Sequence, residues 1–358
     1  LCTSNLPAVA VTPSEHFNIV KYDGDGNTSG NAVTGLGFQP DFVWLKRRDS
    51  DIYHAHYNVL TGIDAQLTSG TEGEFDRDSF VSFDSDGFTV KQAAAGHSQT
   101  NISGGKFIAW CWKVASAASG TTTGSGTGKA YSARYNTDAG FSFIAYEGND
   151  TAAHTIPHHL SKAPELIVVK RREATDPWCV YHEKLHPSTP EQYADEWNAV
   201  ASFHDTTYWN DTAPTSSVFA LGSTNNVNGV DEGYIAYCWH SVDGYSKVGV
   251  YEGNGDDDGT FIYTGFRIKY LWLKNIDASS NWSLYDSERL TISDVIQTGK
   301  PYNPHNTTVI INASNPEDDL GDFRLDFLSN GFKCRDDATI TNASNTYIYF
   351  AIAETPFK

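Results

Sequence analysis

Alternating acidic and amide side chains near the start of the chain have the spacing of a calcium-binding loop. Asp23, Asp25 and Asn27 stand two residues apart and offer the oxygen ligands that Ca²⁺ prefers. The glutamate that closes such a loop at its twelfth position is missing, so the match is incomplete. Asp, Gly and Asn in this order also form plain turns. The sequence therefore leaves a plain turn and a calcium site open, and it suggests no other cofactor.

Aromatic side chains in the least regular stretches are the candidates for ligand binding. Tyr and Trp provide large, rigid contact surfaces at binding sites, and a glycan would stack on such rings with Asn and Asp side chains around it. The alternative is that these rings pack between repeats or between subunits. The five candidates are Tyr131, Tyr135, Trp197, Tyr208 and Trp209.

Side chains suited to hydrolysis are present, but no catalytic motif organises them. Glycoside cleavage needs two carboxyl groups at a defined separation, and Glu183, Glu191 and Asp205 are candidates whose separation a sequence does not give. The chain has no Gly-x-Ser-x-Gly elbow, phosphate-binding loop or dinucleotide fingerprint. His54 and His56 would share one face of a strand, as an exposed pair. We expect a protein that is not an enzyme and has no metal site beyond the calcium candidate.

A repeated phrase indicates the elements that must position these residues. Each copy opens with Tyr, an acidic residue and Gly, continues with an apolar run that ends in Lys46, Lys170 or Lys274, and closes with an apolar, aromatic-rich strand. Short apolar runs between Gly and Asn turns predict antiparallel strands. The expected fold is all-β, with three tandem antiparallel β-sandwich-like repeats of about 100 residues, the size of ordinary domains.

The repeats divide the chain into five segments. Residues 1–13 are expected to connect to an upstream segment, and residues 116–138, rich in Gly, Ser, Thr and Ala, to form a flexible linker. The three β-repeats occupy residues 14–115, 139–245 and 246–358.

Finer features of the repeats are also predicted. Aligning the copies places Tyr53, Trp178 and Trp282 at one position, with aliphatic residues two places later. One short helix is expected at residues 190–200. Asn101, Asn228 and Asn342 precede the closing strands and are expected to be turn residues that bond their own backbone. The irregular stretches 61–78, 185–209 and 289–319 are where recognition is expected, because loops on a fixed frame usually carry binding residues.

Composition limits the partners of the protein. The 358 residues include 44 Asp and Glu but only 25 Lys and Arg, giving a net charge of −19. Nucleic acid and anionic membrane surfaces are therefore disfavoured as partners, and without a long apolar run no membrane insertion is expected. The five cysteines form no Cys-x-x-Cys motif, so we expect small buried apolar groups. The absence of Met and the start at Leu1 suggest a processed product or part of a longer polypeptide.

Taken together, several motifs resemble a repeated β-domain of tailed-phage virion proteins, such as tail fibres and other tail-associated structural proteins that often carry lectin-like sandwich domains. The likeness extends over nearly the whole chain, and each motif is weak by itself. The motifs lie at residues 6–7, 16–17, 35–41, 44–46, 108–113, 139–142, 212–219 and 325–333.

The resemblance implies a place in an extracellular virion and no catalytic residues. We therefore expect a bacteriophage tail-fibre or adhesion segment for host attachment, which binds a host-surface glycan or another virion protein. A homo-oligomer, most simply a trimer, would fit that role. Two alternatives remain open: a decoration (cement) protein of the capsid, and a tail-spike glycan hydrolase.

Overall fold

A computed structural model of the chain describes residues 11–93, 99–197, 203–289, 304–305, 307–319 and 324–356. These residues are almost entirely β, and all the strand pairs are antiparallel, which confirms the prediction of an all-β, sandwich-type fold. One short helix, α1 (Asn225–Asn228), and two 3-10 turns, η2 (Pro13–Glu15) and η3 (Pro190–Gln192), interrupt the strands. In the described part of the chain no helix is long and apolar enough to cross a membrane.

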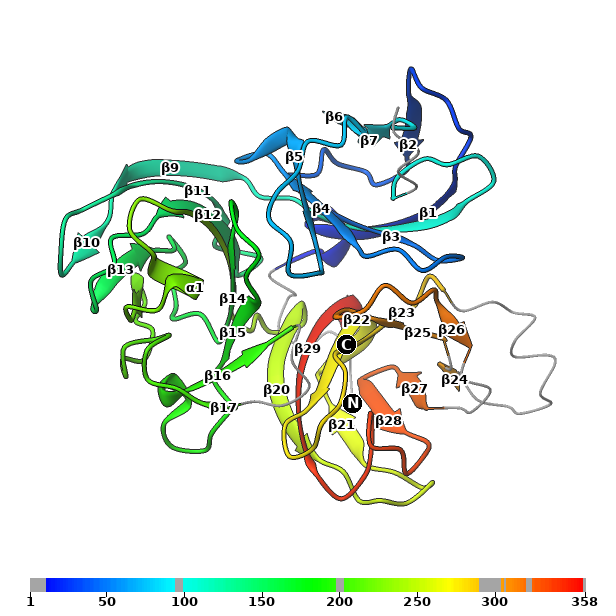
Figure 1. The fold of residues 1–358 in the computed structure, drawn as a ribbon. Helices are drawn as coiled ribbons and strands as arrows, with labels where there is room; N and C mark the ends of the chain where they lie inside the picture. The colour runs from blue at the N-terminus through cyan, green and yellow to red at the C-terminus, as the bar shows by residue number, and fades with distance from the viewer. Residues whose placement is uncertain are drawn as a thin grey trace.

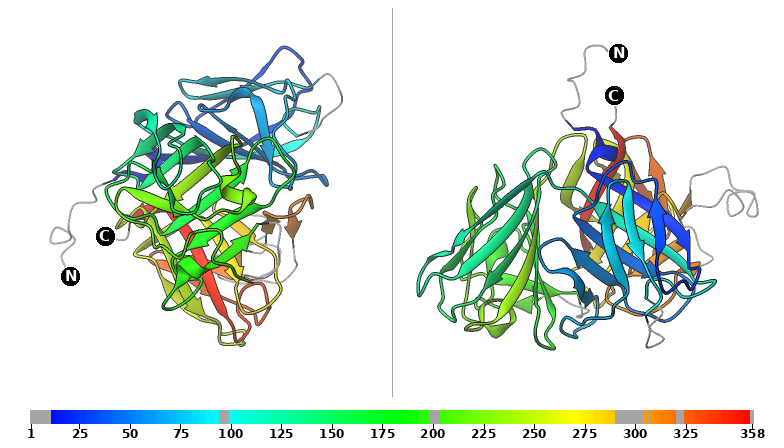
Figure 2. Two further views of the ribbon diagram at one scale, coloured as in Figure 1. Left: turned by 60° about the vertical axis from the view of Figure 1, so that its left-hand side comes forward. Right: turned by 90° about the horizontal axis from the view of Figure 1, so that it is seen from above.

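The strands form three bodies arranged around a common centre (Figures 1 and 2), each with one large sheet and one smaller sheet. The first body has a large sheet in the order β1-β8-β3-β4-β5 and a small sheet β2-β7-β6. Its strands are β1 (Phe17–Asp23), β2 (Asn31–Thr34), β3 (Phe42–Arg47), β4 (Ala55–Asn58), β5 (Gly62–Thr68), β6 (Phe80–Asp84), β7 (Gly87–Val90) and β8 (Lys106–Trp112).

The second body has the largest sheet, in the order β17-β16-β15-β14-β19-β12-β11-β9, faced by the small sheet β10-β13-β18. Its strands are β9 (Ser116–Thr121), β10 (Thr123–Gly124), β11 (Ala130–Asn136), β12 (Phe141–Glu147), β13 (His154–Pro157), β14 (Leu166–Arg171), β15 (Trp178–His182), β16 (Tyr193–Glu196), β17 (Phe203–His204), β18 (Val218–Leu221) and β19 (Gly233–Trp239).

The third body has a large sheet β20-β29-β22-β23-β25-β26 and a small sheet β21-β28-β27-β24. Its strands are β20 (Ser246–Glu252), β21 (Phe261–Tyr263), β22 (Phe266–Asn275), β23 (Ser283–Asp286), β24 (Pro304–His305), β25 (Thr307–Ile310), β26 (Asp318–Asp319), β27 (Leu325–Leu328), β28 (Gly331–Cys334) and β29 (Thr346–Pro356).

The stretch expected to be a flexible linker is instead three strands. β9 and β11 extend the large sheet of the second body beyond β12, and β10 extends its small sheet. Side chains of Ser, Ala, Thr and Gly give no apolar pattern, but their backbone can still complete a sheet whose neighbouring strand supplies the hydrogen-bond partners. Composition alone therefore misassigned residues 116–138.

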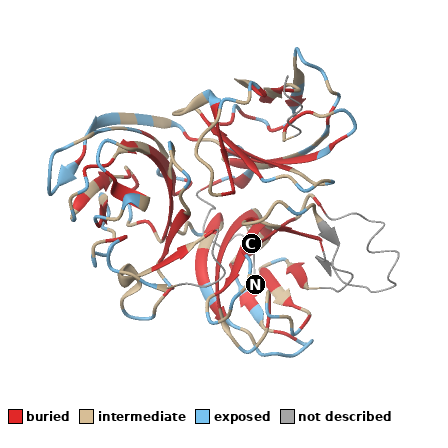
Figure 3. Ribbon diagram, viewed as in Figure 1, coloured by how far each residue is buried: buried red, intermediate tan, exposed pale blue. Residues whose placement is uncertain are grey.

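The large sheets are buried on both faces, and long stretches of their strands are coloured as buried in Figure 3. Successive side chains along these strands enter two different cores. On β3, for example, Trp44 enters a central cluster, whereas Val43 and Leu45 enter the cluster inside the first body. The second and third bodies have corresponding inner clusters of their own. This alternation is what a strand covered on both sides requires.

The central cluster is formed by the faces of the three large sheets that point toward the centre of the protein, away from the small sheets. Indole rings from different bodies meet there: the Trp44 and Trp272 ring centroids lie 5.6 Å apart, and those of Trp239 and Trp272 lie 5.7 Å apart. Trp197 inserts between them, 5.2 Å from Trp44. Aromatic pairs of this kind add about 0.5–1.5 kcal/mol each beyond the area they bury, so the three bodies share one core.

Three lysines occupy matching register positions at the ends of β3, β14 and β22. Each of Lys46, Lys170 and Lys274 is paired across the sheet with an isoleucine of the closing strand. All three are buried, and their ammonium groups donate to backbone carbonyl oxygens. The paired isoleucines are Ile108, Ile235 and Ile348.

The same pairing corrects the predicted alignment of the first repeat. His56 lies opposite Trp44, just as Val180 lies opposite Val168 and Leu284 opposite Trp272, so His54, and not Tyr53, corresponds to Trp178 and Trp282. His54 and His56 are buried in the central region, at 0% and 1% exposure, and are not an exposed pair. These strands also face the central cluster that the three bodies share, and this second buried face could not be predicted from one repeat alone.

The asparagines before the closing strands bond to a distant turn of the same body. They were predicted to bond to their own backbone. They are buried, and their side-chain oxygens accept hydrogen bonds from the turns that follow β1, β12 and β20. The pairs are Asn101 with Asp25 N (3.1 Å), Asn228 with Asn149 N (3.0 Å) and Asn342 with Asn254 N (3.2 Å).

The helix predicted at residues 190–200 is also wrong where it is described. After the short turn η3 the chain continues as β16, and residues 198–200 lie outside the described part. β16 pairs with β15 through Cys179 and Val180, so sheet pairing overrides the weak local helical pattern.

Candidate functional site

Three of the five predicted binding aromatics are core residues. Trp197, Tyr208 and Trp209 are 2%, 4% and 2% exposed, so no ligand ring can stack on them in this structure. Trp197 is covered by Trp178, whose ring centroid lies 4.7 Å away. The prediction of exposed rings is therefore wrong for these residues, because the irregular loop that carries them folds against the sheets.

The other two predicted aromatics lie on β11, at the surface of the second body. Tyr131 and Tyr135 are partly exposed, and the ring of His159 stacks against both, with centroid distances of 5.7 and 5.2 Å. Tyr131 also lines a shallow hollow of ≈ 310 Å³ together with Glu147 and Arg172. These two rings stay candidates for ligand contact.

The calcium candidate is used for local hydrogen bonding. Asp25 Oδ1 accepts from Asn27 N and from Asn101 Nδ2, both at 2.8 Å, and Asp23 forms an ion pair of 2.7 Å with Lys106. Within the described ranges no group of three or more His, Cys, Asp and Glu side chains could hold a metal ion. The geometry is that of a turn clamped by Asn101, and calcium binding stays a prediction.

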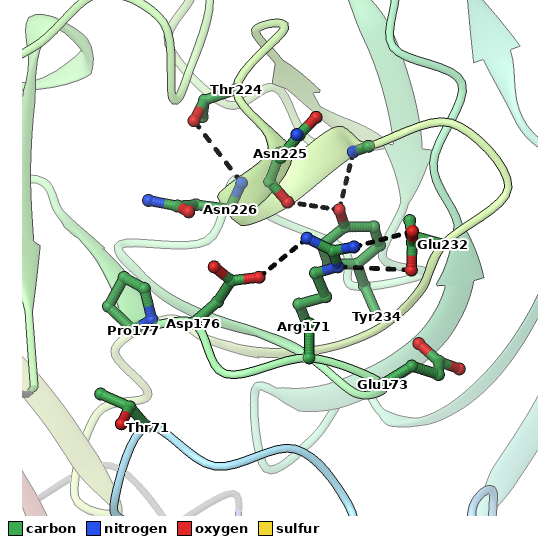
Figure 4. A network of polar contacts seen from close by, with 12 residues as sticks. Thr71, Arg171, Glu173, Asp176, Pro177, Thr224, Asn225, Asn226, Glu232 and Tyr234 are labelled. Atoms are coloured by element: carbon green, nitrogen blue, oxygen red, sulfur yellow. Dashed lines mark hydrogen bonds and ion pairs between the residues drawn. The ribbon is translucent and has the colours of Figure 1, made fainter.

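A dense polar network at one end of the second body is structural (Figure 4). Arg171 bridges Asp176 at 3.0 Å and Glu232 at 2.7 Å, and the Tyr234 hydroxyl donates to Asn225 O at 2.5 Å. Its charged groups are mutually paired, and the neighbouring carboxylates raise the pKa of Arg171 although partial burial opposes them. The network closes the ends of β14 and β19, and its cation Arg171 is held by two carboxylates.

A groove lies between the second and third bodies. It has a volume of ≈ 650 Å³. One wall is the segment between β15 and β16, and the other is built from β20, the end of β22 and the start of β29. Its lining residues are Lys184, Leu185, His186, Pro187, Tyr193, Val250, Glu252, Ile276, Asp277 and Thr346.

The first wall of the groove is an aromatic platform. The rings of His186 and Tyr193 are stacked face to face, with centroids 4.6 Å apart and planes 6° apart, and His204 packs edge-on against Tyr193. Ser188 N and Thr189 N donate to His186 Nδ1. In the neutral imidazole the proton therefore resides on Nε2, which is left as a donor.

His182, at the end of β15, connects this wall to the third body. Lys184 N donates to His182 Nδ1 at 3.1 Å, and the other ring nitrogen contacts Tyr349 O of the third body at 3.3 Å. Burial lowers the pKa of His182 to about 3, so the ring is neutral and Nε2 donates to that carbonyl oxygen. The platform is thus tied directly to the neighbouring body.

The second wall presents two carboxylates beside an apolar floor. Thr346 N donates to Asp277 Oδ2 at 2.7 Å, and the Thr346 hydroxyl contacts Glu252 Oε2 at 3.2 Å. No cation among the described residues forms an ion pair with either carboxylate. Leu185 and Ile276 lie between these groups and the rings. Stacked rings, an apolar floor and a few hydrogen-bonding groups are the usual composition of a small-ligand site.

Comparison with known proteins assigns the chain to a family without assigning it an activity. A family profile described as a domain of unknown function (DUF7483) matches residues 12–356. The chain belongs to this family. No curated protein and no solved structure matches the chain. In this member of DUF7483, any function must therefore be argued from its own geometry.

Sequence reasoning missed most residues of the groove. His186 and Tyr193 lie in the irregular stretch 185–209, where recognition was expected, but the groove also needs the neighbouring body. The repeated Tyr-Glu-Gly phrase marked Glu252 as a structural position, because Gly253 closes a tight turn: a Cβ there would lie 2.0 Å from Ala343 O. A comparison of the three copies could have pointed to the site. At the position of Glu252, Asp23 and Glu147 each form an ion pair with a lysine, whereas no ion pair of Glu252 is found among the described residues.

Proposed function

We propose that this chain is a non-enzymatic binding protein of a phage virion, a tail-fibre or adhesion segment, and that the groove between the second and third bodies binds a surface glycan. The observation that carries the proposal is the stacked pair His186 and Tyr193 facing the carboxylates Glu252 and Asp277. The virion setting rests on the sequence resemblance.

The chemistry of the groove fits a sugar ring. A pyranose has one apolar face that packs on an aromatic ring and a rim of hydroxyl groups that need acceptors and donors. The ring platform offers the first, while the carboxylates and the Nε2 proton of His186 offer the second. The two walls belong to bodies that share one core, so the groove is held open before a ligand arrives, which lowers the cost of binding.

The carboxylates are arranged for binding rather than for cleavage. Glycoside hydrolysis uses two carboxyl groups that flank the scissile bond from opposite sides. Here Glu252 and Asp277 lie on one wall, and both are held by Thr346. This arrangement supports a lectin-like role over the glycan hydrolase considered from the sequence.

A glycan array of bacterial surface polysaccharides, probed with the labelled chain, tests the proposal. We expect retention on a small set of glycans and loss of at least tenfold in signal for Tyr193→Ala. The matched control is Tyr53→Ala, which removes an exposed tyrosine of the first body and should keep the signal. Equal retention of wild type and Tyr193→Ala, or retention of neither, would contradict the assignment of the groove.

The virion setting and the expected trimer have separate tests. Mass measurement of the purified chain shows whether it forms a homo-oligomer. A map of the particle that carries it would place it on the tail, as proposed, or on the capsid lattice, as a decoration protein would be.

A further inference from the structure

The residue 116–138 segment closes one side of the second body. β11 pairs with β12 of the large sheet, with Tyr131 opposite Tyr146. β10 pairs with the edge strand of the small sheet, β13, with Thr123 opposite Thr155. One excursion of the chain therefore covers both edge strands on this side of the sandwich.

The corresponding strands of the third body are not extended by a further strand in the described part of the chain. β20 and β21 occupy the places of β12 and β13, and each is the end strand of its sheet, without a further strand among the described residues. Three of the large apolar side chains that remain exposed lie here: Val250 at 40%, Phe261 at 44% and Tyr263 at 55%. Exposed apolar edge strands are rare in folded proteins unless something covers them.

The first body also has end strands, β1 and β2, that are not extended by a further strand among the described residues. The positions of Phe261 and Tyr263 are occupied there by Ala32 and Thr34, as the pairing of β2 with β7 and of β21 with β28 shows. On β1 the side chain of Asn18 accepts a hydrogen bond from Ile19 N at 3.0 Å, which occupies a backbone donor of the strand. Polar and small residues therefore blunt this edge, whereas the third body carries aromatic rings.

The second body also indicates the chemistry of the missing strand. Lys129, directly before β11, forms an ion pair of 2.9 Å with Glu147. Glu252 occupies the same position at the end of β20, where the pairing of Tyr251 with Tyr347 matches that of Tyr146 with Tyr234. A strand on β20 would therefore carry a basic residue one place beyond the residue that stands opposite Glu252, as Lys129 lies one place beyond Ala130.

We propose that the side of the third body formed by β20 and β21 is a docking surface for a β-hairpin of another polypeptide, which pairs antiparallel with β20 as β11 pairs with β12. The docked strand begins beyond Val248, whose N–H is already bonded to Ser241 Oγ at 3.0 Å. Its neighbour covers Phe261 and Tyr263 as β10 covers Thr155. The proposal does not rest on glycan binding, but a docked strand would share Val250 and Glu252 with the groove and would compete with a glycan there.

A synthetic peptide of residues 116–137 is the probe, because it carries the hairpin that closes the second body. Fluorescence anisotropy of the labelled peptide against the full chain should show saturable binding. The double variant Phe261→Lys and Tyr263→Lys alters exposed positions outside the groove and should weaken binding at least tenfold. The matched control, Ala32→Lys with Thr34→Lys, should leave it within twofold. Hydrogen exchange of wild type should slow at residues 249–252 when the peptide is bound.

Three results would overturn the proposal. The first is no rise in anisotropy when the chain is in 100-fold excess over the labelled peptide. The second is equal binding to wild type and to the double variant, which would place the peptide elsewhere. The third is self-association of the wild type, abolished by the double variant, because a second copy of the chain would then be the occupant.

Discussion

The ammonium group of Lys170 lies 3.0 Å from the carbonyl oxygen of Thr71, which belongs to a different body of the protein. The same ammonium donates to Asp176 O at 2.8 Å. In the first body, Lys46 likewise reaches Ser314 O of the third body at 3.0 Å. A buried cation at the end of a central strand therefore ties each of these bodies to a neighbour.

Replacing Lys170 with Met should destabilise the protein. The side chain would still fill its site, but the carbonyl oxygen of Asp176 would lose the Lys170 donor, at a cost of roughly 1–3 kcal/mol for a buried group left unsatisfied. Thr71 O would lose its contact with Lys170 but keep the hydrogen bond from Asp176 N at 2.9 Å. Denaturant unfolding measures this loss, and Lys162→Met, at an exposed position, is the control. A loss no larger than that of the control would show that the buried lysines do not link the bodies.

Replacing His56 with Leu should stabilise the protein, most of all in acid. His56 is buried, and neither ring nitrogen has a hydrogen-bond partner among the described residues, while the equivalent residues are Val180 and Leu284. Burial lowers the pKa of His56 to about 3 from 6.5. Below pH 6.5 the unfolded chain therefore binds a proton that the folded chain does not, and stability falls until about pH 3.

The expected size follows from that difference in pKa. At pH 4.5 the lowered pKa of His56 reduces the free energy of unfolding by about 2–3 kcal/mol, and His56→Leu should remove this loss. Unfolding free energies measured at pH 7 and pH 4.5 for wild type, His56→Leu and the exposed control His204→Leu give the comparison. If wild type and His56→Leu lose the same stability between the two pH values, the ring is protonated or solvated in the folded state.

Adding a methyl group at Gly148 should be strongly destabilising. Its N–H bonds to Glu232 O at 2.9 Å, and an added Cβ would lie 2.3 Å from Gly229 O, so the backbone would have to move. We expect Gly148→Ala to cost more than about 2 kcal/mol, the range of overpacked sites. Gly120→Ala is the control, because its Cβ would meet only the Tyr131 ring, at 3.3 Å. Similar thermal midpoints for the two variants would contradict the tight turn.

The strands of the central sheets could be predicted because their chemistry is local. Apolar runs ending in Lys46 and Lys170 have the length and residue types of buried strands, and the structure places them at the centre of their sheets. Residues 116–138 could not be predicted in this way, since their strands are specified by the backbone of β12 rather than by their own side chains. The sequence also does not show that the inner sheet faces meet in one core.

The candidate site was predictable only in part, for the same reason. Trp197 looks like a loop residue in the sequence, but it is buried by Trp44 and Trp272 of the other two bodies. His186 and Tyr193 have no local feature that separates them from other loop residues. Their stacked rings become one wall of a groove because the third body places Glu252 on the other wall. That proximity depends on how the bodies pack together.

A structure of the chain with a bound glycan from the array tests the central claim most directly. We predict a sugar ring in the groove, stacked on the exposed face of His186 within van der Waals contact of about 4 Å, with hydroxyl groups bonded to Glu252 or Asp277. A sugar bound over Tyr131 and Tyr135 instead, with the groove filled only by solvent, would contradict the assignment of this site.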